Sequence, residues 1–505
     1  MHVNVLNTLM NISMQRLPFT FFKDTVTLCP IIIMHTPQNI TVMVTSKCFL
    51  VVLLLSLLHS FALLCSAAYP SGGRSSKEDD PQEDDIGVFN PFFFPQRKFA
   101  FGRYQEDNGS LWVLHKFYEK HLILKAYNEY RVALLEANPN TFVLPHHCDA
   151  DRIYVVTNGK GTLTLLTDKN RESYSLVPGV VVRVPTGTTV YLVNQDDKEK
   201  LNIAVLVRPV NNPGKFEEFF PAGQYPQSFY RHLSLDVLED ALNTRSELLD
   251  RLLQANQSQQ GMFRIASQEQ IKTLSKGAST PSEKEEGLAF NLFAQNPKYS
   301  NQNGKFFEAC PREFELLRDL DAGLVGLELN KGSIFVPHYN TKSTFVIIVT
   351  EGSGYVEMVC PIAPEKSYQG EKEEEDEKAQ REIEEEIERR EEKIAGHYAK
   401  MRVLLSAGDV IITPACHPVT YFTPEDQHLR FIAFGLYHQN NTKIFIARKD
   451  NVVKQMDSAA KELSFGVPSS LVDEVFNNLP ESYFASRQSQ QRGSEASNLD
   501  FARLF

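Results

Sequence analysis

The sequence predicts a mainly β protein built of two similar barrels or sandwiches in tandem, each followed by α-helices. The first observation is an internal repeat: Glu136-Ala-Asn138 lies seven residues before Pro145-His146, and Glu328-Leu-Asn330 lies seven residues before Pro337-His338, an offset of 192. The second is a series of short apolar runs separated by turn residues, which is typical of a sandwich or barrel. The third is a leucine-rich or valine-rich stretch with helical spacing after each β region.

The repeat continues along the chain, but its offset grows. Gly159-x-Gly161 corresponds to Gly352-x-Gly354 at an offset of 193, whereas Gly179-x5-Pro185 corresponds to Gly408-x5-Pro414 at 229. A module of roughly 190 residues has therefore been duplicated, which favours two domains of one architecture. The second copy has gained about 36 residues (229 minus 193) between these motifs.

The extra residues of the second copy are strongly acidic. Residues 371–394 hold 13 Asp and Glu against 6 Lys and Arg. Like charges at this density cannot be buried, so we predict a solvated insertion, in part helical, at 365–400.

The strands of the first copy are expected where β-branched, aromatic or aliphatic residues cluster. Asn158-Gly159, Pro178-Gly179 and Thr186-Gly187 separate these runs and are strong turn formers. The runs themselves are Val155-Val156, Leu163–Leu165, Val180–Val182, Tyr191–Val193 and Ile203–Val207.

Two helical stretches follow the β regions. One carries leucines at helical spacing between Leu235 and Leu253, and the other runs from Leu471 to Leu479 after a Pro468-Ser-Ser helix start. An apolar stripe that does not fold back on its own barrel must pack against a neighbour.

A secretory signal peptide is expected at residues 43–68. An apolar run from Cys48 to about Leu64 follows Lys47, and Cys65-Ser-Ala67-Ala68 offers small residues for cleavage. We interpret Met43 as the true start. The alternative is a signal-anchor helix, because the run is nearly long enough to span a bilayer.

The whole chain divides into eight expected parts. These are a gene-model extension at 1–42, the signal peptide at 43–68, a disordered acidic leader at 69–88, an N-terminal barrel with helices at 89–265, a linker at 266–288, a C-terminal barrel with helices at 289–486, the insertion at 365–400 within it, and a polar tail at 487–505.

Charge and cysteine content exclude several classes of protein. The net charge of −11 argues against nucleic-acid binding, which needs a basic face. No stretch outside the signal peptide is apolar enough to span a membrane, so we expect the mature form to have no membrane partner. Four scattered cysteines remain after signal removal, Cys148, Cys310, Cys360 and Cys416, and they form no disulfide framework. Asn108, Asn256 and Asn440 begin glycosylation sequons.

The motifs resemble a known family. Pro-His followed by Gly-x-Gly, and then Gly-x5-Pro-x-Gly, resembles the two-motif pattern of the cupin barrel. Two such copies with helical extensions resemble the vicilins, the bicupin 7S seed storage globulins of plants. The match covers roughly residues 89–486. The sequence segments that carry the resemblance are Asn90-Pro-Phe-Phe-Phe94, Leu144-Pro-His-His147, Asp149-Ala-Asp151, Gly332–Asn340 and Pro414–Val419.

The resemblance implies a jelly-roll fold for each barrel and a non-enzymatic, nutrient-reservoir function. It also implies homotrimers formed through the helical extensions, and delivery through the secretory pathway to the protein storage vacuole. A glycoprotein with allergen potential would be in keeping with the family.

Catalytic cupins carry His-x-His-x3,4-Glu in the first motif and one more His in the second, which together suit a divalent transition metal. The first copy keeps His146 but has Cys148 for the second His, Arg152 or Ile153 for the Glu, and Val190 for the last His. The second copy keeps His338, followed by Asn340, Thr344 or Phe345, and Val419. Oxidase or dioxygenase chemistry is therefore not expected.

One departure suggests a different metal site. Cys416 replaces a motif glycine, His417 follows it, and His338 is expected near the same barrel mouth. A thiolate with two imidazoles suits copper or zinc. The alternative is that Cys416 only fills a turn, because adjacent residues on a strand face opposite sides. The alternatives to storage are thus a small-ligand or copper- or zinc-binding cupin module and, further, a metal-dependent cupin oxidase.

Overall fold

The computed structural model describes residues 92–95, 100–120, 122–168, 170–253, 259–361, 398–447, 451–477 and 483–487. The expected gene-model extension, signal peptide and acidic leader, the insertion up to residue 397, and the polar tail beyond residue 487 lie outside these ranges, as does Asn256. Among the residues that are described, no helix is long and apolar enough to cross a membrane.

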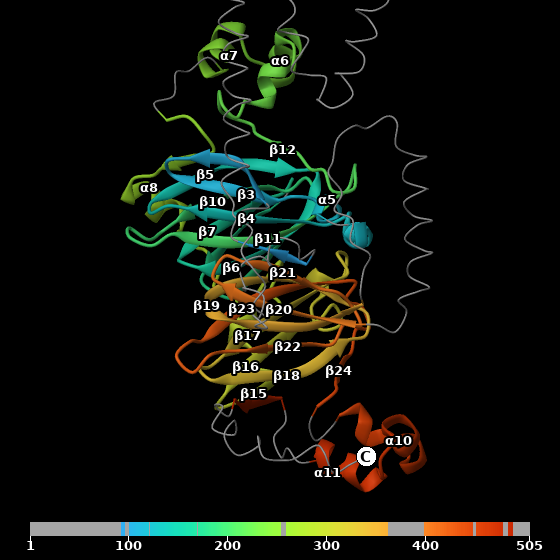
Figure 1. Ribbon diagram of the computed structural model, residues 1–505. Helices are drawn as coiled ribbons and strands as arrows, with labels where there is room; N and C mark the ends of the chain where they lie inside the picture. The colour runs from blue at the N-terminus through green and yellow to red at the C-terminus, as the bar shows by residue number, and fades with distance from the viewer. Residues whose placement is uncertain are drawn as a thin grey trace, which may run out of the picture. The chain divides into compact units, whose positions relative to one another are not determined.

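The first copy forms a barrel of two sheets, whose strands run from blue to green in Figure 1. One sheet has the order β14-β9-β6-β11-β4-β3-β2, in which β14 is Ala289–Asn291, and the other has the order β12-β5-β10-β7-β8 with β13 beside β5. Its strands are β2 (Ala100–Glu106), β3 (Gly109–Leu114), β4 (Arg131–Ala137), β5 (Thr141–Cys148), β6 (Ala150–Asn158), β7 (Gly161–Leu166), β8 (Arg171–Leu176), β9 (Val180–Val184), β10 (Thr189–Asn194), β11 (Leu201–Pro209), β12 (Glu218–Phe219) and β13 (Phe263–Ile265).

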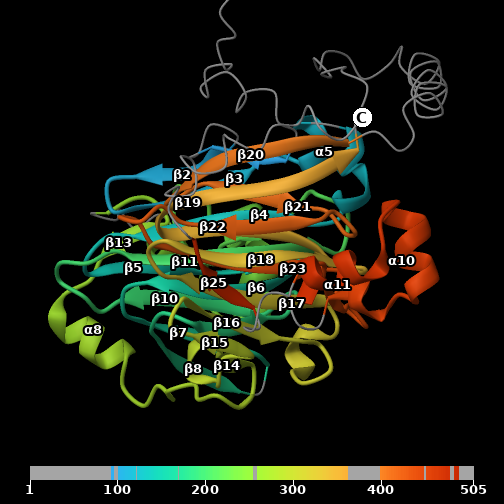
Figure 2. The same ribbon diagram turned by 60° about the horizontal axis from the view of Figure 1, so that its bottom comes forward.

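The second copy repeats this barrel in yellow to orange, as Figures 1 and 2 show. The long strand β19 pairs with β20, β21, β22 and β23. Its end at Pro361 pairs with Tyr398 of β20, so the acidic insertion joins the two ends of this hairpin. The strands are β15 (Tyr299–Asn301), β16 (Gly304–Ala309), β17 (Ala322–Leu329), β18 (Ser333–Asn340), β19 (Thr344–Pro361), β20 (Tyr398–Ser406), β21 (Val410–Thr413), β22 (Val419–Phe422), β23 (Leu429–Leu436), β24 (Lys443–Phe445) and β25 (Phe484–Ser486).

The two copies exchange short strands. β1 (Phe93–Phe94), from the start of the first copy, pairs with β21 of the second barrel. β14 (Ala289–Asn291), expected to open the second domain, pairs with β9 of the first barrel. The expected boundaries at 89–265 and 289–486 therefore do not separate two self-contained barrels. The stretch expected as the linker, 266–288, contains the helix α8 (Gln268–Leu274), which a capping box at Ser267 begins.

Apolar and polar contacts join the barrels. One apolar cluster includes Ile153 and Leu206 from the first barrel together with Leu317 and Phe434 from the second. The hydroxyl of Tyr130 donates a hydrogen bond to the carbonyl of Leu320 at 2.9 Å. The shared core means that neither barrel can open without exposing apolar surface to water.

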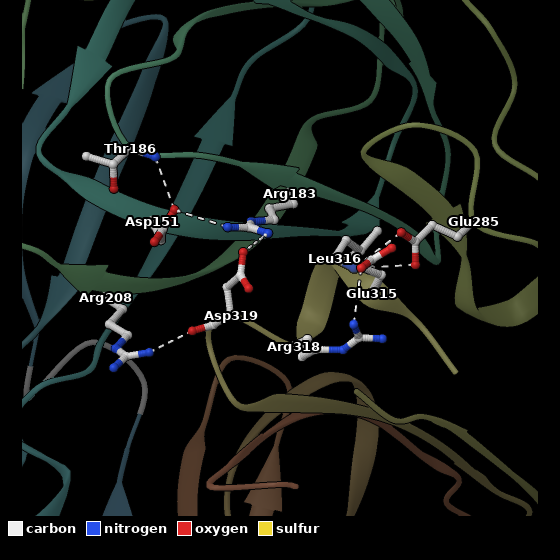
Figure 3. Close-up of polar contacts among 9 residues, drawn as sticks. All are labelled: Asp151, Arg183, Thr186, Arg208, Glu285, Glu315, Leu316, Arg318 and Asp319. Carbon is white, nitrogen blue, oxygen red and sulfur yellow. Dashed lines mark hydrogen bonds and ion pairs between the residues drawn. The ribbon is translucent and has the colours of Figure 1, made fainter. Parts of the chain in front are cut away.

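Figure 3 shows the polar contacts at the rim of this contact region. Arg183 of β9 pairs with the carboxylate of Asp319 at 2.7 Å, and Arg208 of β11 donates to the Asp319 carbonyl at 2.8 Å. The backbone N–H of Leu316 donates to Glu285 at 3.2 Å. Two arginines of the first barrel thus hold a loop of the second.

Each helical extension is a pair of short helices, drawn outside its own barrel in Figure 1. The first pair is α6 (Leu235–Leu242) and α7 (Ser246–Leu253), separated at Asn243, which has left-handed backbone angles. The second pair is α10 (Ser458–Phe465), ended by the left-handed Gly466, and α11 (Ser469–Asn477). The shorter helices are α5 (Phe117–Lys120), η2 (Leu122–Tyr127), η3 (Phe229–His232), η4 (Leu292–Ala294), η5 (Glu315–Leu317) and η6 (Val452–Gln455).

The helix pairs bury few of their apolar side chains. Leu238, Leu249 and Val472 are buried, whereas many others are exposed to solvent in the single chain. The exposed ones are Leu235, Val237, Leu242, Leu248 and Leu252 in the first pair and Leu463, Phe465, Leu471 and Val475 in the second. Exposed apolar surface of this kind marks an interaction site.

Candidate functional site

In the first barrel, the guanidinium group of Arg152 lies beside His146, the histidine that catalytic cupins use as a metal ligand. His146 on β5 lies opposite Val190 on β10, so the position of the last His ligand is filled by a buried valine. The Arg152 guanidinium lies 3.2 Å from His146 Nε2, and it also donates to the Tyr154 hydroxyl at 3.1 Å. The sequence left Arg152 and Ile153 as alternatives for the Glu position. The structure places Arg152 beside His146.

The environment of His146 keeps its ring neutral. Its Nδ1 lies 2.9 Å from the carbonyl of Leu144, which can only accept, so Nδ1 carries the hydrogen and Nε2 accepts from Arg152. Burial first, and the charge of Arg152 second, lower the pKa of His146 to about 3. A neutral ring beside a fixed guanidinium leaves no lone pair for a metal.

The second barrel repeats this arrangement with a lysine. His338 on β18 lies opposite Val419 on β22, and its Nδ1 donates to the Val336 carbonyl at 2.9 Å. Burial, followed by the charge of Lys443, holds the pKa of His338 well below its usual value. Lys443 donates to the side-chain oxygen of Asn340 at 3.1 Å. The two positions that would carry further ligands are thus occupied by a valine and by an amide bound to an ammonium group.

The predicted site at Cys416 and His417 does not gather around His338. Cys416 is exposed, in a turn with a φ of 63°, and its thiol donates to the carbonyl of Thr341 at 3.6 Å. His417 donates from Nδ1 to the carbonyl of Ala415 and packs edge-on against Phe92. His338 is buried among aromatic rings. The structure does not bring the ligand atoms of this trio together, because an exposed turn and a barrel interior supply its members, and in the described ranges only a different trio has its ligand atoms within 4.8 Å of one another. Metal binding at Cys416 stays a prediction.

The chain instead brings Glu308, Cys310 and His438 together. Their ligand atoms lie within 4.8 Å of one another, and no other such group of three occurs in the described ranges. Glu308 is the penultimate residue of strand β16, Cys310 follows that strand, and His438 lies just after β23. Lys298 forms an ion pair with Glu308. A cavity of about 370 Å³ adjoins them and is lined in part by Cys310 and His438.

The histidine of this trio is fixed by its neighbours. Ser343 Oγ lies 2.9 Å from the carbonyl of Leu436, to which it donates, and 2.8 Å from His438 Nδ1, from which it accepts. The hydrogen therefore resides on Nδ1, and the Nε2 lone pair faces Cys310 Sγ at 3.6 Å. This contact is a thiol–imidazole hydrogen bond.

Both side chains are neutral near pH 7. Burial lowers the pKa of His438 to about 4, and burial, followed by the charge of Glu308, raises the pKa of Cys310 to about 12. A reactive cysteine needs the opposite shift, since the thiolate is the nucleophile. The pair is therefore unsuited to thiolate catalysis.

The sequence held one signal for this trio that was missed. Glu308 and Cys310 are two residues apart at the end of a strand, a spacing that places side chains on one face. Nothing local connects them to His438, which is 128 residues from Cys310.

The structure describes two of the three predicted glycosylation sequons. Asn440 is exposed at the rim of the cavity, whereas Asn108 is half-buried and donates to the Phe263 carbonyl.

Comparison with known proteins decides the family. A cupin family model matches residues 127–249 and 290–472. Vicilin C72 from Gossypium hirsutum is 57% identical over 419 residues, which cover 80% of this chain and 70% of the relative. This chain belongs to the vicilin family. The predicted resemblance, and the predicted pair of cupin barrels with helical extensions, are confirmed.

Solved structures agree with this assignment. The crystal structure of vicilin from Solanum lycopersicum matches with a TM-score of 0.68 and 37% identity, covering 79% of this chain and 100% of that one. A pro-11S globulin of pumpkin, at 14% identity and a TM-score of 0.58, shares the fold alone. The protein is thus a bicupin seed storage globulin of the 7S type, as its motifs predict.

Proposed function

We propose that this vicilin is a nutrient reservoir with no catalytic activity of its own. The observation that supports this is the cation beside each motif histidine: Arg152 in the first barrel and Lys443 near Asn340 in the second. Positive charge at these points disfavours a divalent ion by Coulomb repulsion. Val190 and Val419 remove the last ligand from each set. Cupin oxidase chemistry therefore lacks the groups that would hold its metal.

The test is oxalate turnover by the purified protein with added manganese, iron or copper. We expect a rate equal to that of the metal without protein. A matched variant, Cys148→His with Arg152→Glu and Val190→His, restores the cupin ligand pattern around His146. It is expected to bind one more metal ion per chain than the unmodified protein does. Turnover by the unmodified protein that a chelator abolishes would contradict the proposal.

We propose further that three chains assemble head to tail through the helical extensions. The two pairs, α6 with α7 and α10 with α11, present different apolar surfaces to solvent. Contacts between unlike surfaces close into a ring when the rotation permits. Burial of leucine and valine side chains supplies the driving force, at about 25 cal/mol per Å².

The route to the site of storage follows from the family and from the N-terminal sequence. An apolar run after Lys47, followed by Ala67-Ala68, has the form of a cleavable secretory signal. We propose that the mature chain passes through the secretory pathway to the protein storage vacuole.

A further inference from the structure

We propose that the cavity beside His438 binds one zinc-class divalent ion per chain through Glu308, Cys310 and His438. This site lies apart from both barrel centres and from the turn at Cys416. It is independent of the storage function, which needs no metal.

The spacing of the strongest pair already suits a metal. Zinc bonds of about 2.3 Å to sulfur and about 2.0–2.1 Å to nitrogen, at the tetrahedral angle, place the two ligand atoms about 3.5 Å apart. Cys310 Sγ and His438 Nε2 are 3.6 Å apart. The Glu308 carboxylate lies within 4.8 Å of both and completes a sulfur, nitrogen and oxygen set that zinc accepts. An ion can therefore enter with little movement of the backbone.

The histidine is prepared for this role by a partner behind it. Metal-bound histidines nearly always donate their other ring N–H to a neighbouring group, which fixes the tautomer. Ser343 supplies that acceptor at 2.8 Å from Nδ1. Glycines flank the ring: a Cβ at Gly323 would lie 2.4 Å from its Cδ2, and a Cβ at Gly435 would lie 2.6 Å from its Nδ1. The ring is thus held by close backbone contact on two strands.

The cavity provides access and an open coordination position. It is lined by Cys310 and His438, so an ion held there can take a water molecule as its fourth ligand. Lys298 competes for the site through its ion pair with Glu308, but 48% of its side chain is exposed. It can therefore move into solvent when an ion arrives. Lys443 and Arg312 remain close to the trio and weaken the affinity without blocking the ligands.

Cobalt(II) is the most informative probe, because thiolate bonding gives a cobalt charge-transfer band and tetrahedral coordination gives intense visible bands. The full chain, freed of metal by a chelator, is titrated with cobalt and then with zinc. We expect one cobalt per chain, with both sets of bands, and displacement by one equivalent of zinc. Cys310→Ser should abolish the charge-transfer band. His438→Gln should weaken binding by at least roughly ten-fold.

Three further variants keep the test valid if a ligand variant misfolds. Ser343→Ala leaves every ligand in place and should weaken binding about 10- to 100-fold, the usual cost of losing such a partner. Lys298→Met removes the competing ammonium group and should tighten binding. Cys416→Ser is the matched control, because it removes an exposed cysteine elsewhere and should change nothing. Absence of cobalt bands in the unmodified protein, their survival in Cys310→Ser, or their loss in Cys416→Ser would each overturn the proposal.

Discussion

Glutamates at Leu463 and Val475 are expected to convert the assembled protein into single chains. These side chains are 88% and 63% exposed on α10 and α11, so the substitutions leave the packing within the helix pair intact. Phe476 is a poorer choice, because its ring packs against Phe465 within the pair. Glutamate keeps the helix propensity close to that of leucine. In an interface, each unpaired charge would cost several kcal/mol.

Sedimentation velocity gives the measurement. The unmodified chain should sediment as a trimer, and Leu463→Glu with Val475→Glu as a monomer. Ile265→Glu is the matched control, since Ile265 is also an exposed apolar residue but lies on β13 outside the helices. A trimer that persists in the double variant would remove α10 and α11 from the interface.

The head-to-tail arrangement has a stricter consequence. Leu248→Glu with Leu252→Glu should disable the other face, on α7, where these leucines are 54% and 70% exposed. Each double variant alone should be monomeric. Mixed in equal amounts, they retain one intact face each and should form dimers but no closed ring. Recovery of trimers in the mixture would contradict the head-to-tail arrangement, because a closed ring of three needs both faces of every chain.

Acidification from pH 7.5 to pH 5.0 is expected to cost about 2 kcal/mol of unfolding free energy for each of three buried histidines. Burial lowers the pKa of His146 to about 3 and that of His438 to about 4, and it holds the pKa of His338 well below the ordinary value of about 6.5. Below pH 6.5 each of these histidines binds a proton in the unfolded chain but not in the folded chain. This stability is therefore present above pH 6.5 and is lost as the pH falls toward the folded pKa. Glu218 has the opposite effect on stability: burial raises the pKa of its carboxyl, so acidification favours the folded state at this residue.

Urea unfolding at fixed protein concentration and at the two pH values measures this effect. His338→Gln should lower the free energy of unfolding at pH 7.5, because the surrounding aromatic side chains lose the imidazole ring they pack against. It should also remove about a third of the acid-dependent loss, because two of the three histidines remain. His146→Gln should do the same. His232→Gln, at an exposed position on η3, is the control and should leave the full loss. An equal loss in all four proteins would show that these histidines do not govern the acid response.

The sequence was sufficient for the architecture because the repeat carries the core motifs at constant spacing. The strand register confirms how those motifs align: Val190 lies opposite His146 and Val419 lies opposite His338, where the ligand pattern placed them. The leucine stripe from Leu235 was also interpreted correctly as helical, although Asn243 divides it into two helices. Long periodic features of this kind are strongly determined by local sequence.

The exchanged strands and the metal-ligand trio were not accessible in this way. β1 and β14 have two and three residues, too few for a pattern that identifies a partner sheet. Cys416 and His417 are adjacent in sequence, and this led to a site that the fold does not assemble. Cys310 and His438 are distant in sequence and meet because β16 and β23 both pair with β17. Proximity created by strand order is invisible until the topology is known.

The most direct test of the storage function is the amount of this protein per seed, measured by quantitative mass spectrometry through maturation and germination. A protein whose barrel centres lack the cupin metal ligands, and whose value is its amino acids, should rise to a major fraction of seed protein during maturation. It should then be degraded within the first days of germination. A low and constant amount through both stages would contradict the account, since a reservoir must be both filled and emptied.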